Sequence, residues 1–278
     1  MDVDVAIQQA VRLAQEADAL LVTAGAGLGV DSGLPDFRGT EGFWHAYPAI
    51  AKLGLRFEQM ANPSWFQESP ELAWAFYGHR LALYRKTAPH TGFQRLLDAG
   101  GKKRLGYFVF TSNVDGQFQK AGFDPDRIVE CHGSIHHFQC CQPCQKVIWD
   151  AATESVLVDE SKFLAIAPLP HCPHCRKTAR PNVLMFYDDA WIANRSHAQE
   201  HRLRTWLQSV RLDRGKLVVI ELGAGTAVPS VRNFSGRMVN DYLADLIRIN
   251  PREPEVPPGH IGLPFGAKEG LRRIFEST

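Results

Sequence analysis

The sequence predicts an α/β fold, in which helices cover both faces of a parallel sheet and a smaller domain lies on the rim of that sheet. Short, continuous apolar runs separated by helical segments are typical of parallel strands that are buried on both sides. Two stretches interrupt this alternation, residues 41–85, rich in aromatic side chains, and 136–180, which holds paired cysteines. We expect both to be insertions that form the smaller domain, leaving residues 1–40, 86–135 and 181–278 for the larger one.

The elements follow from local patterns along the chain. Small apolar residues recur at helical spacing from Val3 to Ala17, which predicts a first helix. Further helices are expected at residues 197–210, 238–244 and 267–275, and from about Pro70 within the aromatic stretch. Residues 250–266 contain five prolines, so we expect no regular structure there. The apolar runs predict buried strands at Ala19–Thr23, Tyr107–Thr111, Arg127–Cys131, Lys216–Leu222 and Asp245–Asn250.

Length and charge limit the classes of protein that the chain can belong to. Its 278 residues are 45% hydrophobic and 22% charged, enough to bury a sizeable core. A formal net charge of +1 creates no overall field that would attract nucleic acid or an anionic membrane. The N-terminus starts acidic, and no apolar run approaches the ~18 residues of a spanning helix. We therefore expect a cytoplasmic protein that binds neither membrane nor, directly, nucleic acid.

The six cysteines fall within 45 residues, five of them in the clusters CCQPC and CPHC. In a reducing compartment, paired clusters are typical of metal sites rather than disulfides. Cys172 and Cys175 have C-x2-C spacing, and their partner pair can be Cys140 with Cys144 or Cys141 with Cys144, because both spacings suit structural zinc. The spacing leaves both alternatives open. Four thiolates leave no open coordination position, so this zinc would hold the fold together without touching a substrate.

A glycine-rich stretch, TAGAGLGVDSGLPDFRG (Thr23–Gly39), follows the first predicted strand. A strand that ends in Gly25, Ala26 and Gly27 brings backbone N–H groups close to a ligand, and phosphate is the usual one. The motif is weak by itself, because the fingerprint G-x-G-x-x-G requires a third glycine where this chain has Val30. An ordinary glycine-rich loop would look much the same.

Four motifs in sequence order make the prediction more specific. The glycine-rich stretch is followed by TSNVDG (Thr111–Gly116), by ECHGS (Glu130–Ser134), and by the cysteine pairs with RPNVLMF (Arg180–Phe186). In this order the chain resembles the sirtuins, the NAD-dependent protein lysine deacylases, from about Ala19 to Asn250. The resemblance implies a Rossmann-like NAD-binding domain and a smaller domain made of a helical module and a zinc ribbon. NAD and an acylated lysine of a protein substrate would meet in the cleft between them.

The resemblance also assigns residues to the nicotinamide end of NAD. Asp36, Phe37 and Arg38 match the segment that closes over the nicotinamide ribose. A guanidinium there can supplement backbone donors to the phosphates. Asn113 and Asp115 match the polar pair that holds the nicotinamide amide and orders water.

Other positions match the parts of the family fold that hold the rest of NAD. The GAG loop after the first strand corresponds to the loop under the pyrophosphate. Gly223, Ala224 and Gly225 correspond to the segment around the adenosine, and Asn250 to a residue near the adenine ribose. Two departures from the family pattern fall in these motifs, since Gly29 stands in place of serine and Ser112 in place of glutamine.

His132 matches the catalytic histidine of the family, and an imidazole can take a proton from a hydroxyl near neutral pH. In the implied reaction the acyl oxygen attacks C1′ of the nicotinamide ribose and nicotinamide leaves. His132 then activates the ribose hydroxyl that attacks the alkylimidate carbon, and water completes the release of free lysine and O-acyl-ADP-ribose. The first zinc cysteine of the family stands eight positions after this histidine, which favours Cys140, with Cys144, Cys172 and Cys175, over Cys141.

The motif AFYGHR places Tyr77 and Arg80 on neighbouring positions of the helix after Pro70. This is similar to the sirtuin subclass that removes acidic acyl groups, because arginine and a phenol can bind a terminal carboxylate. A packed aromatic beside a solvated arginine is the alternative explanation. The implied activity is an NAD-dependent deacetylase and possible desuccinylase or demalonylase. The alternative is a mono-ADP-ribosyltransferase or NAD hydrolase on the same scaffold.

Overall fold

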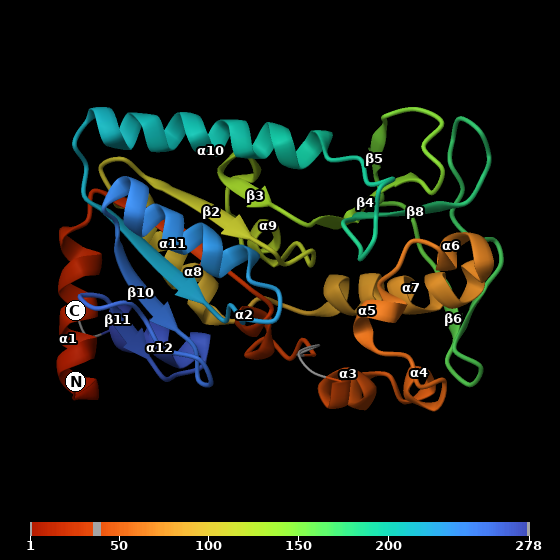
Figure 1. Cartoon of the computed structure of the whole chain (residues 1–278), viewed down its shortest axis with the longest axis horizontal. Coiled ribbons are helices and arrows are strands. Elements are labelled where there is room, and N and C mark those ends of the chain that lie inside the picture. Colours follow the sequence, from red (N-terminus) through yellow and green to blue (C-terminus); the bar gives the residue numbers. More distant parts are fainter. Residues whose placement is uncertain (1, 36–39, 277–278) are drawn as a thin grey trace.

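The computed structural model of the chain describes residues 2–35 and 40–276, including the side chains of all of these except residues 40–42. Figure 1 shows a larger sheet-and-helix part and a smaller part beside it. The larger part is built around a six-stranded sheet in the order β11-β10-β9-β1-β2-β3, in which every neighbouring pair is parallel. Its strands are β1 (Ala19–Ala24), β2 (Tyr107–Thr111), β3 (Ile128–Glu130), β9 (Leu217–Leu222), β10 (Asp245–Ile249) and β11 (Ile261–Leu263).

Helices cover both faces of this sheet, as Figure 1 shows. One face packs against α1 (Val3–Glu16), α8 (Thr91–Gly101) and α12 (Ala267–Phe275). The other face packs against α10 (Asn194–Leu212) and α11 (Ser230–Tyr242). Successive residues of a strand point to opposite faces of the sheet. A strand that is apolar at every position can therefore contribute side chains to the hydrophobic core on each face. The predicted α/β class is confirmed.

Strand β1 illustrates why a continuous apolar run was needed. Leu20 and Val22 belong to the core under α1, α8 and α12, whereas Ala19 and Leu21 belong to the core under α10 and α11. All six residues of β1 are buried. Short elements connect the strands: α2 (Gly27–Val30) follows β1, α9 (Gln117–Lys120) follows β2, and η1 (Pro125–Arg127) directly precedes β3.

Two predictions about the C-terminal region were wrong. Residues 250–266 contain the edge strand β11, which pairs with β10 through the buried residues Ile261 and Leu263. The prolines of this segment lie outside those three residues, so they do not interrupt the strand. Helix α11 begins at Ser230, eight residues earlier than predicted, because Val231 already packs into the core. It ends before Leu243, whose φ of 53° is left-handed.

The smaller part consists of a helical module and an antiparallel sheet. The helices are α3 (Thr40–Ala46), α4 (Pro48–Lys52), α5 (Phe57–Met60), α6 (Trp65–Glu68) and α7 (Pro70–Lys86). The three-stranded sheet has the order β5-β4-β8, with β4 (Gly133–Cys140), β5 (Ile148–Asp150) and β8 (Ala179–Val183). A separate hairpin pairs β6 (Leu157–Asp159) with β7 (Leu164–Ile166).

Trp74 of α7 joins the helical module to the antiparallel sheet. Its fully buried ring packs against Phe66 and Phe138, and its Nε1 donates a hydrogen bond of 3.0 Å to the carbonyl of Ala179. The two insertions thus share one core. Within the parts of the chain that the structure describes, none of the helices combines the length and apolar character needed to span a membrane.

Candidate active site

A cavity of about 400 Å³ lies between the carboxyl ends of β1, β2 and β9 and the smaller part of the molecule. In a doubly wound sheet, ligands bind at this edge, where the strand order reverses. Here the reversal falls between β1 and β9, because the chain proceeds to β2 and β3 on one side and to β10 and β11 on the other. The cavity brings together nine residues expected from the sequence: Gly25, Ala26, Tyr77, Arg80, Asn113, Asp115, His132, Ala224 and Gly225.

Two glycine loops meet at this reversal point. A Cβ on Gly25 would lie 2.8 Å from the Cα of Ala224, and one on Gly27 would lie 2.7 Å from the Cα of Gly223. Gly223 has a φ of +56°, a left-handed conformation that favours glycine. The loops therefore need glycine to pack backbone against backbone. Gly25 and Ala224 remain at the cavity wall, whereas Gly27 and Gly223 are not among the residues that line it.

The backbone N–H groups of the first loop are partly used within the protein. The N–H of Gly25 donates to the carbonyl of Leu222 (2.9 Å), and that of Gly27 donates to Gly223 (3.0 Å). These two N–H groups are not free to bind a phosphate. The two residues shape the loop, and the expectation that this loop lies under the pyrophosphate stays a prediction.

Asn250 lies behind the second loop and does not line the cavity. It is 1% exposed, and its Nδ2 donates to the carbonyl of Ala224 at 2.8 Å. Its Oδ1 accepts hydrogen bonds from the N–H groups of Arg252 and Glu253. Asn250 therefore fixes the position of the loop that carries Ala224 and Gly225.

Asn113 and Asp115 reach the cavity from the loop after β2. The Nδ2 of Asn113 donates to the carbonyl of Gly25 at 3.1 Å, which ties the β1 and β2 loops together. Asp115 is 8% exposed, and its Oδ1 accepts a hydrogen bond of 2.9 Å from the N–H of Gln117. Burial, assisted by the negative charge of Glu130, raises the pKa of Asp115 to about 6. This carboxyl can hold or release a proton close to neutral pH.

His132 lies just after β3, at the junction between the two parts of the molecule. Its carbonyl accepts a hydrogen bond of 2.9 Å from the N–H of Leu184, and its Nε2 lies 3.1 Å from the Oγ of Ser230. Burial lowers the pKa of His132, because the charged imidazolium loses solvation. The ring is therefore neutral at pH 7, the state that a general base requires.

Gly133 follows His132 in a backbone conformation that fixes the turn into β4. Its φ is +79°, and a Cβ at this position would lie 2.0 Å from the carbonyl oxygen of Asn182 on β8. No side chain fits in that space. The close approach of β4 to β8 thus sets where the histidine enters the cavity.

Tyr77 and Arg80 enter the cavity from α7. The Nε and Nη2 of Arg80 donate to the hydroxyl of Tyr84 at 3.0 and 2.8 Å, and the guanidinium lies over the rings of Phe76, Tyr77 and Tyr84. Arg80 is 6% exposed, so it is not a solvated surface arginine. The buried hydroxyl of Tyr77 has no hydrogen-bond partner among the described residues. Burial raises the pKa of Tyr77 to about 12, so its hydroxyl stays protonated and can donate.

The last residue of β8 and the segment that follows it form another wall of the cavity, through residues 183–186. A fully buried ion pair stabilises this segment. Arg180 Nη1 and Nη2 each donate a hydrogen bond of 2.8 Å to the carboxylate of Asp188, and both side chains have 0% exposure. The second oxygen of Asp188 also accepts from the N–H of Met185. Tyr187, between these groups, is 88% exposed and has a left-handed φ of 57°.

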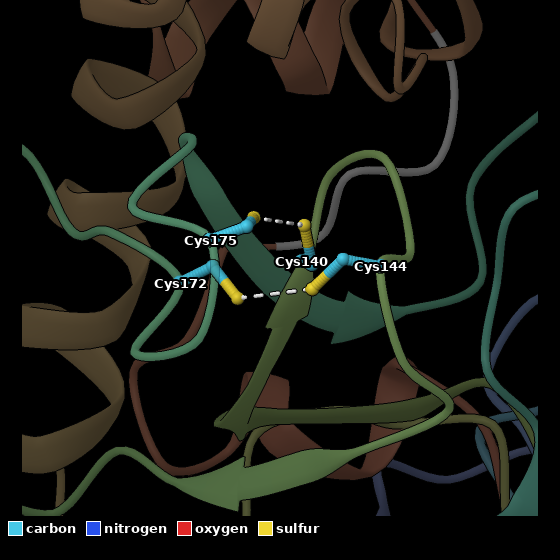
Figure 2. Close-up of side chains that lie close together, drawn as sticks. All are labelled: Cys140, Cys144, Cys172 and Cys175. Atoms are coloured by element: carbon cyan, nitrogen blue, oxygen red, sulfur yellow. Dashed lines mark hydrogen bonds between the residues drawn. The ribbon is translucent and has the colours of Figure 1, made fainter.

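The four zinc-ligand candidates form one cluster at the ends of β4 and β8, with their sulfur atoms facing one another (Figure 2). All four sulfur atoms lie within 4.8 Å of one another, with Cys140 and Cys175 at 3.6 Å and Cys144 and Cys172 at 3.7 Å. Tetrahedral zinc with Zn–S bonds of about 2.3 Å requires sulfur atoms about 3.8 Å apart. The cluster therefore fits structural zinc. Cys141 is instead buried in the apolar core of the smaller part.

Asp36, Phe37 and Arg38 lie outside the described residues.

Gly29 and Ser112, the two departures from the family pattern, lie within the described residues. Gly29 is buried, and a Cβ there would lie 2.9 Å from Cδ1 of Leu34, which itself lines the cavity. Leu34 thus occupies the space that a serine at position 29 would need. Ser112 also lines the cavity.

Sequence reasoning missed two polar residues of the site. Tyr84, the hydrogen-bond partner of Arg80, stands four positions after it on α7, and this spacing could have identified it. Ser230 is 98 residues away from His132 in the chain, and no local pattern predicts that they meet.

Comparisons with known proteins agree with this geometry. A sequence model described as the Sir2 family matches residues 25–203. The NAD-dependent protein deacylase of Thermococcus sibiricus is 29% identical over 257 residues, which cover 91% of this chain and 88% of that protein. That of a Thermus thermophilus strain is 27% identical over 282 residues, covering 97% and 94%. A solved Sir2 homologue in complex with NAD shares the fold with a TM-score of 0.71 and 24% identity, over 97% of this chain and 93% of that one.

The family match covers more than half of the chain and includes the cavity-lining residues from Gly25 to Phe186. It also includes all four clustered cysteines. The resemblance inferred from the sequence motifs is confirmed: this chain belongs to the Sir2 family, the sirtuins.

Proposed function

We propose that this protein is an NAD-dependent protein lysine deacylase, which consumes NAD and releases nicotinamide, the free lysine and O-acyl-ADP-ribose. The observation that carries the proposal is the single cavity into which the loops after β2 and β3 and helix α7 bring Asn113, Asp115, His132 and Arg80. The relatives from Thermococcus sibiricus and Thermus thermophilus bear the name of this activity. An acylated lysine is part of a protein, so the partners are acylated proteins.

In the proposed reaction the cavity binds NAD at the carboxyl edge of the sheet. The loop with Ala224 and Gly225 faces the adenosine side, and Asn113 and Asp115 hold the nicotinamide amide. Support comes from the position of these residues around one cavity and from the pKa of Asp115 at about 6, which allows its carboxyl to donate or accept. Asp36, Phe37 and Arg38 are proposed to close over the ribose, from the sequence motif alone.

His132 acts as the general base of the second half of the reaction. After nicotinamide has left, it takes the proton of a ribose hydroxyl, whose oxygen then bonds to the carbon of the acyl group. The lowered pKa of His132 keeps the imidazole neutral and ready for this proton at pH 7. The protein otherwise acts by holding two substrates in register and excluding water.

The remaining features have structural roles in this proposal. The four cysteines bind zinc that joins the carboxyl end of β4 to the segment before β8, at the opposite ends of these strands from the cavity. The NAD-binding domain comprises residues 1–40, 86–135 and 181–278, and the smaller domain residues 41–85 and 136–180. A zinc site of reduced thiolates suits the reducing cytoplasm, where we place the protein.

We also propose that the acyl pocket accepts acidic acyl groups such as succinyl and malonyl. The buried guanidinium of Arg80 supplies positive charge at the cavity wall, and the unpartnered hydroxyl of Tyr77 supplies a donor. A buried hydroxyl without a partner is unfavourable, and the terminal carboxylate of an acyl chain would satisfy it.

A panel of peptides that differ only in the acyl group on one lysine tests both proposals. Wild-type protein with NAD should release nicotinamide and give a peptide mass reduced by the acyl group. Labelled protein or bare ADP-ribose, without loss of the acyl group, would contradict the deacylase function. Arg80→Met and Tyr77→Phe should reduce turnover of succinyl-lysine more than that of acetyl-lysine. Lys86→Met, an exposed site on the same helix, is the control, and equal succinyl-lysine activity in wild type and Arg80→Met would refute the acidic preference.

A further inference from the structure

Ser230, the first residue of α11, contacts the ring of His132 from the face of the sheet that α10 and α11 cover. Its Oγ lies 3.1 Å from His132 Nε2, a distance within the range of a hydrogen bond. Within the described residues, this hydroxyl has no other hydrogen-bond partner. Both residues are half-buried, and Val228 and Val231, two positions before and one position after Ser230, line the cavity.

The position of Ser230 is fixed by elements on which the fold itself depends. Val231, the next residue, is 1% exposed and packs into the core between α11 and the sheet. Pro229 precedes it and restricts the backbone where the helix begins. Ser230 does not serve as the helix cap, since the N-cap residue is Pro229. The serine hydroxyl is therefore held in place by the helix start, and its hydrogen bond is directed at the histidine.

A base that must take up a proton benefits from a partner that suits both of its protonation states. Neutral imidazole carries one N–H and one bare nitrogen, whereas imidazolium carries two N–H groups. When Nδ1 is the bare nitrogen, Nε2 carries its hydrogen in both protonation states, and the Ser230 hydroxyl can accept from Nε2–H before and after the proton is taken up. An ammonium in this place could only donate and could not accept from Nε2–H.

We propose that Ser230 is a positioning residue for the base His132, an inference that rests on the proposed deacylase function. Its hydroxyl holds the imidazole ring in the orientation in which the ring meets the ribose hydroxyl, and keeps its hydrogen bond when the ring becomes charged. In that step the ribose O–H bond breaks and its proton goes to Nδ1 of His132, while Nε2–H keeps its hydrogen bond to Ser230. The electron pair left on the oxygen forms the new bond to the acyl carbon. A base held by a third group is the arrangement seen generally in nucleophile activation.

The two halves of the reaction separate this role from a structural one. Nicotinamide leaves before His132 acts, so exchange of labelled nicotinamide into NAD, in the presence of an acylated peptide, reports only the first half. Formation of deacylated peptide reports both halves. A positioning residue should affect the ratio of the two rates, whereas a loss of folding or of NAD binding lowers both together.

The experiment compares Ser230→Val with Ser230→Thr, two side chains of equal size of which only threonine has the hydroxyl. In Ser230→Val and Ser230→Ala the rate of deacylation should fall about tenfold, which is part of the roughly 10²–10⁴-fold rate acceleration that a positioned general base supplies. The rate of nicotinamide exchange should stay near that of the wild type. Ser230→Thr should restore deacylation to within about threefold. Ser235→Ala, on the same helix but bonded to Thr23 and not to the histidine, should leave the ratio unchanged.

The outcomes distinguish a failure of the proposed role of Ser230 from a failure of the proposed deacylase function. Equal exchange-to-deacylation ratios in wild type, Ser230→Val and Ser230→Thr would overturn the role of Ser230 and leave the deacylase function standing. Parallel loss of both rates in Ser230→Val but not in Ser230→Thr would also overturn it, by assigning the hydroxyl to NAD binding or folding. Absence of nicotinamide exchange and of deacylation in the wild type would overturn the deacylase function and the role of Ser230 with it. If Ser230→Val does not fold, the comparison of Ser230→Ala with Ser230→Thr decides.

Discussion

Gly133, next to the proposed base, gives a prediction whose size can be worked from the structure. Alanine at this position would place its Cβ 2.0 Å from the carbonyl oxygen of Asn182, whereas ordinary C···O contacts are about 3.3 Å. The neighbour is backbone, so β4 and β8 would have to separate where they meet, and the hydrogen bond from Leu184 to the carbonyl of His132 would be lost. The left-handed φ of +79° adds a further penalty for a residue with a side chain.

The left-handed conformation costs about 1–2 kcal/mol, and the lost hydrogen bond costs about 1 kcal/mol. Gly133→Ala should therefore lower the free energy of unfolding by about 2–3 kcal/mol and the Tm by about 4–6 °C for a chain of this length. Gly236→Ala is the matched control: a Cβ there has no neighbour within 4 Å, and the residue lies inside α11. It should raise stability by up to about 1 kcal/mol.

Urea unfolding followed by tryptophan fluorescence measures both variants, and deacylation assays follow the displacement of His132. Gly133→Ala should lose deacylation even at temperatures where it remains folded, because the strand separation moves the histidine. Wild-type stability and turnover in Gly133→Ala would show that the two strands can separate without cost, and would refute the reasoning.

Four further predictions concern other parts of the site. Asp188→Asn leaves the fully buried charge of Arg180 without its partner and should lower stability by about 3–5 kcal/mol, measured by urea unfolding; a change below about 1 kcal/mol would contradict the importance of the pair. Tyr187→Gly relieves a left-handed tyrosine that is 88% exposed and should raise the Tm slightly, by about 1–2 °C, in differential scanning calorimetry; a lower Tm would mean that the ring makes stabilising contacts. The lowered pKa of His132 keeps its base form populated as the pH falls, so the rate of deacylation should be constant from about pH 8 to pH 6.5 and fall only in more acidic solution. A fall that already begins above pH 7 would contradict a buried neutral imidazole. Finally, the purified protein should contain one zinc per chain by elemental analysis, and a strong chelator should lower the Tm, whereas a metal-free protein with unchanged Tm would argue against the cluster as a zinc site.

The sequence-level prediction of the sheet succeeded because the signal was local. Each strand is a short run of apolar residues, and a run such as Ala19–Ala24 is apolar throughout because both of its faces are covered. The cysteine pairs were similarly visible, since metal ligands occur at short, regular spacings. The failure at β11 has the opposite cause: three residues among prolines carry no pattern, and their strand exists only because β10 offers an edge to pair with.

The parts of the site that lie far apart in the chain could not be predicted from local patterns. His132 was identified by its motif, but its hydrogen bond to Ser230 depends on the packing of α11 against the sheet. Which of Cys140 and Cys141 belongs to the zinc-ligand cluster also depends on tertiary packing. Cys140 ends β4 and Cys141 directly follows it, and the packing of this strand end directs Cys140 to the cluster and Cys141 to the apolar core.

Local sequence patterns were sufficient to predict the α/β class, the family and the residue types of the site, because apolar periodicity and motif spacing are properties of short segments. The atoms that are available to a ligand could be identified only from the three-dimensional packing. The N–H groups of Gly25 and Gly27 donate hydrogen bonds within the protein, and Arg80 is a buried residue that lines the cavity rather than a solvated side chain. Burial and hydrogen-bond partners depend on segments that are distant in the chain, and these determine which groups can act on a substrate.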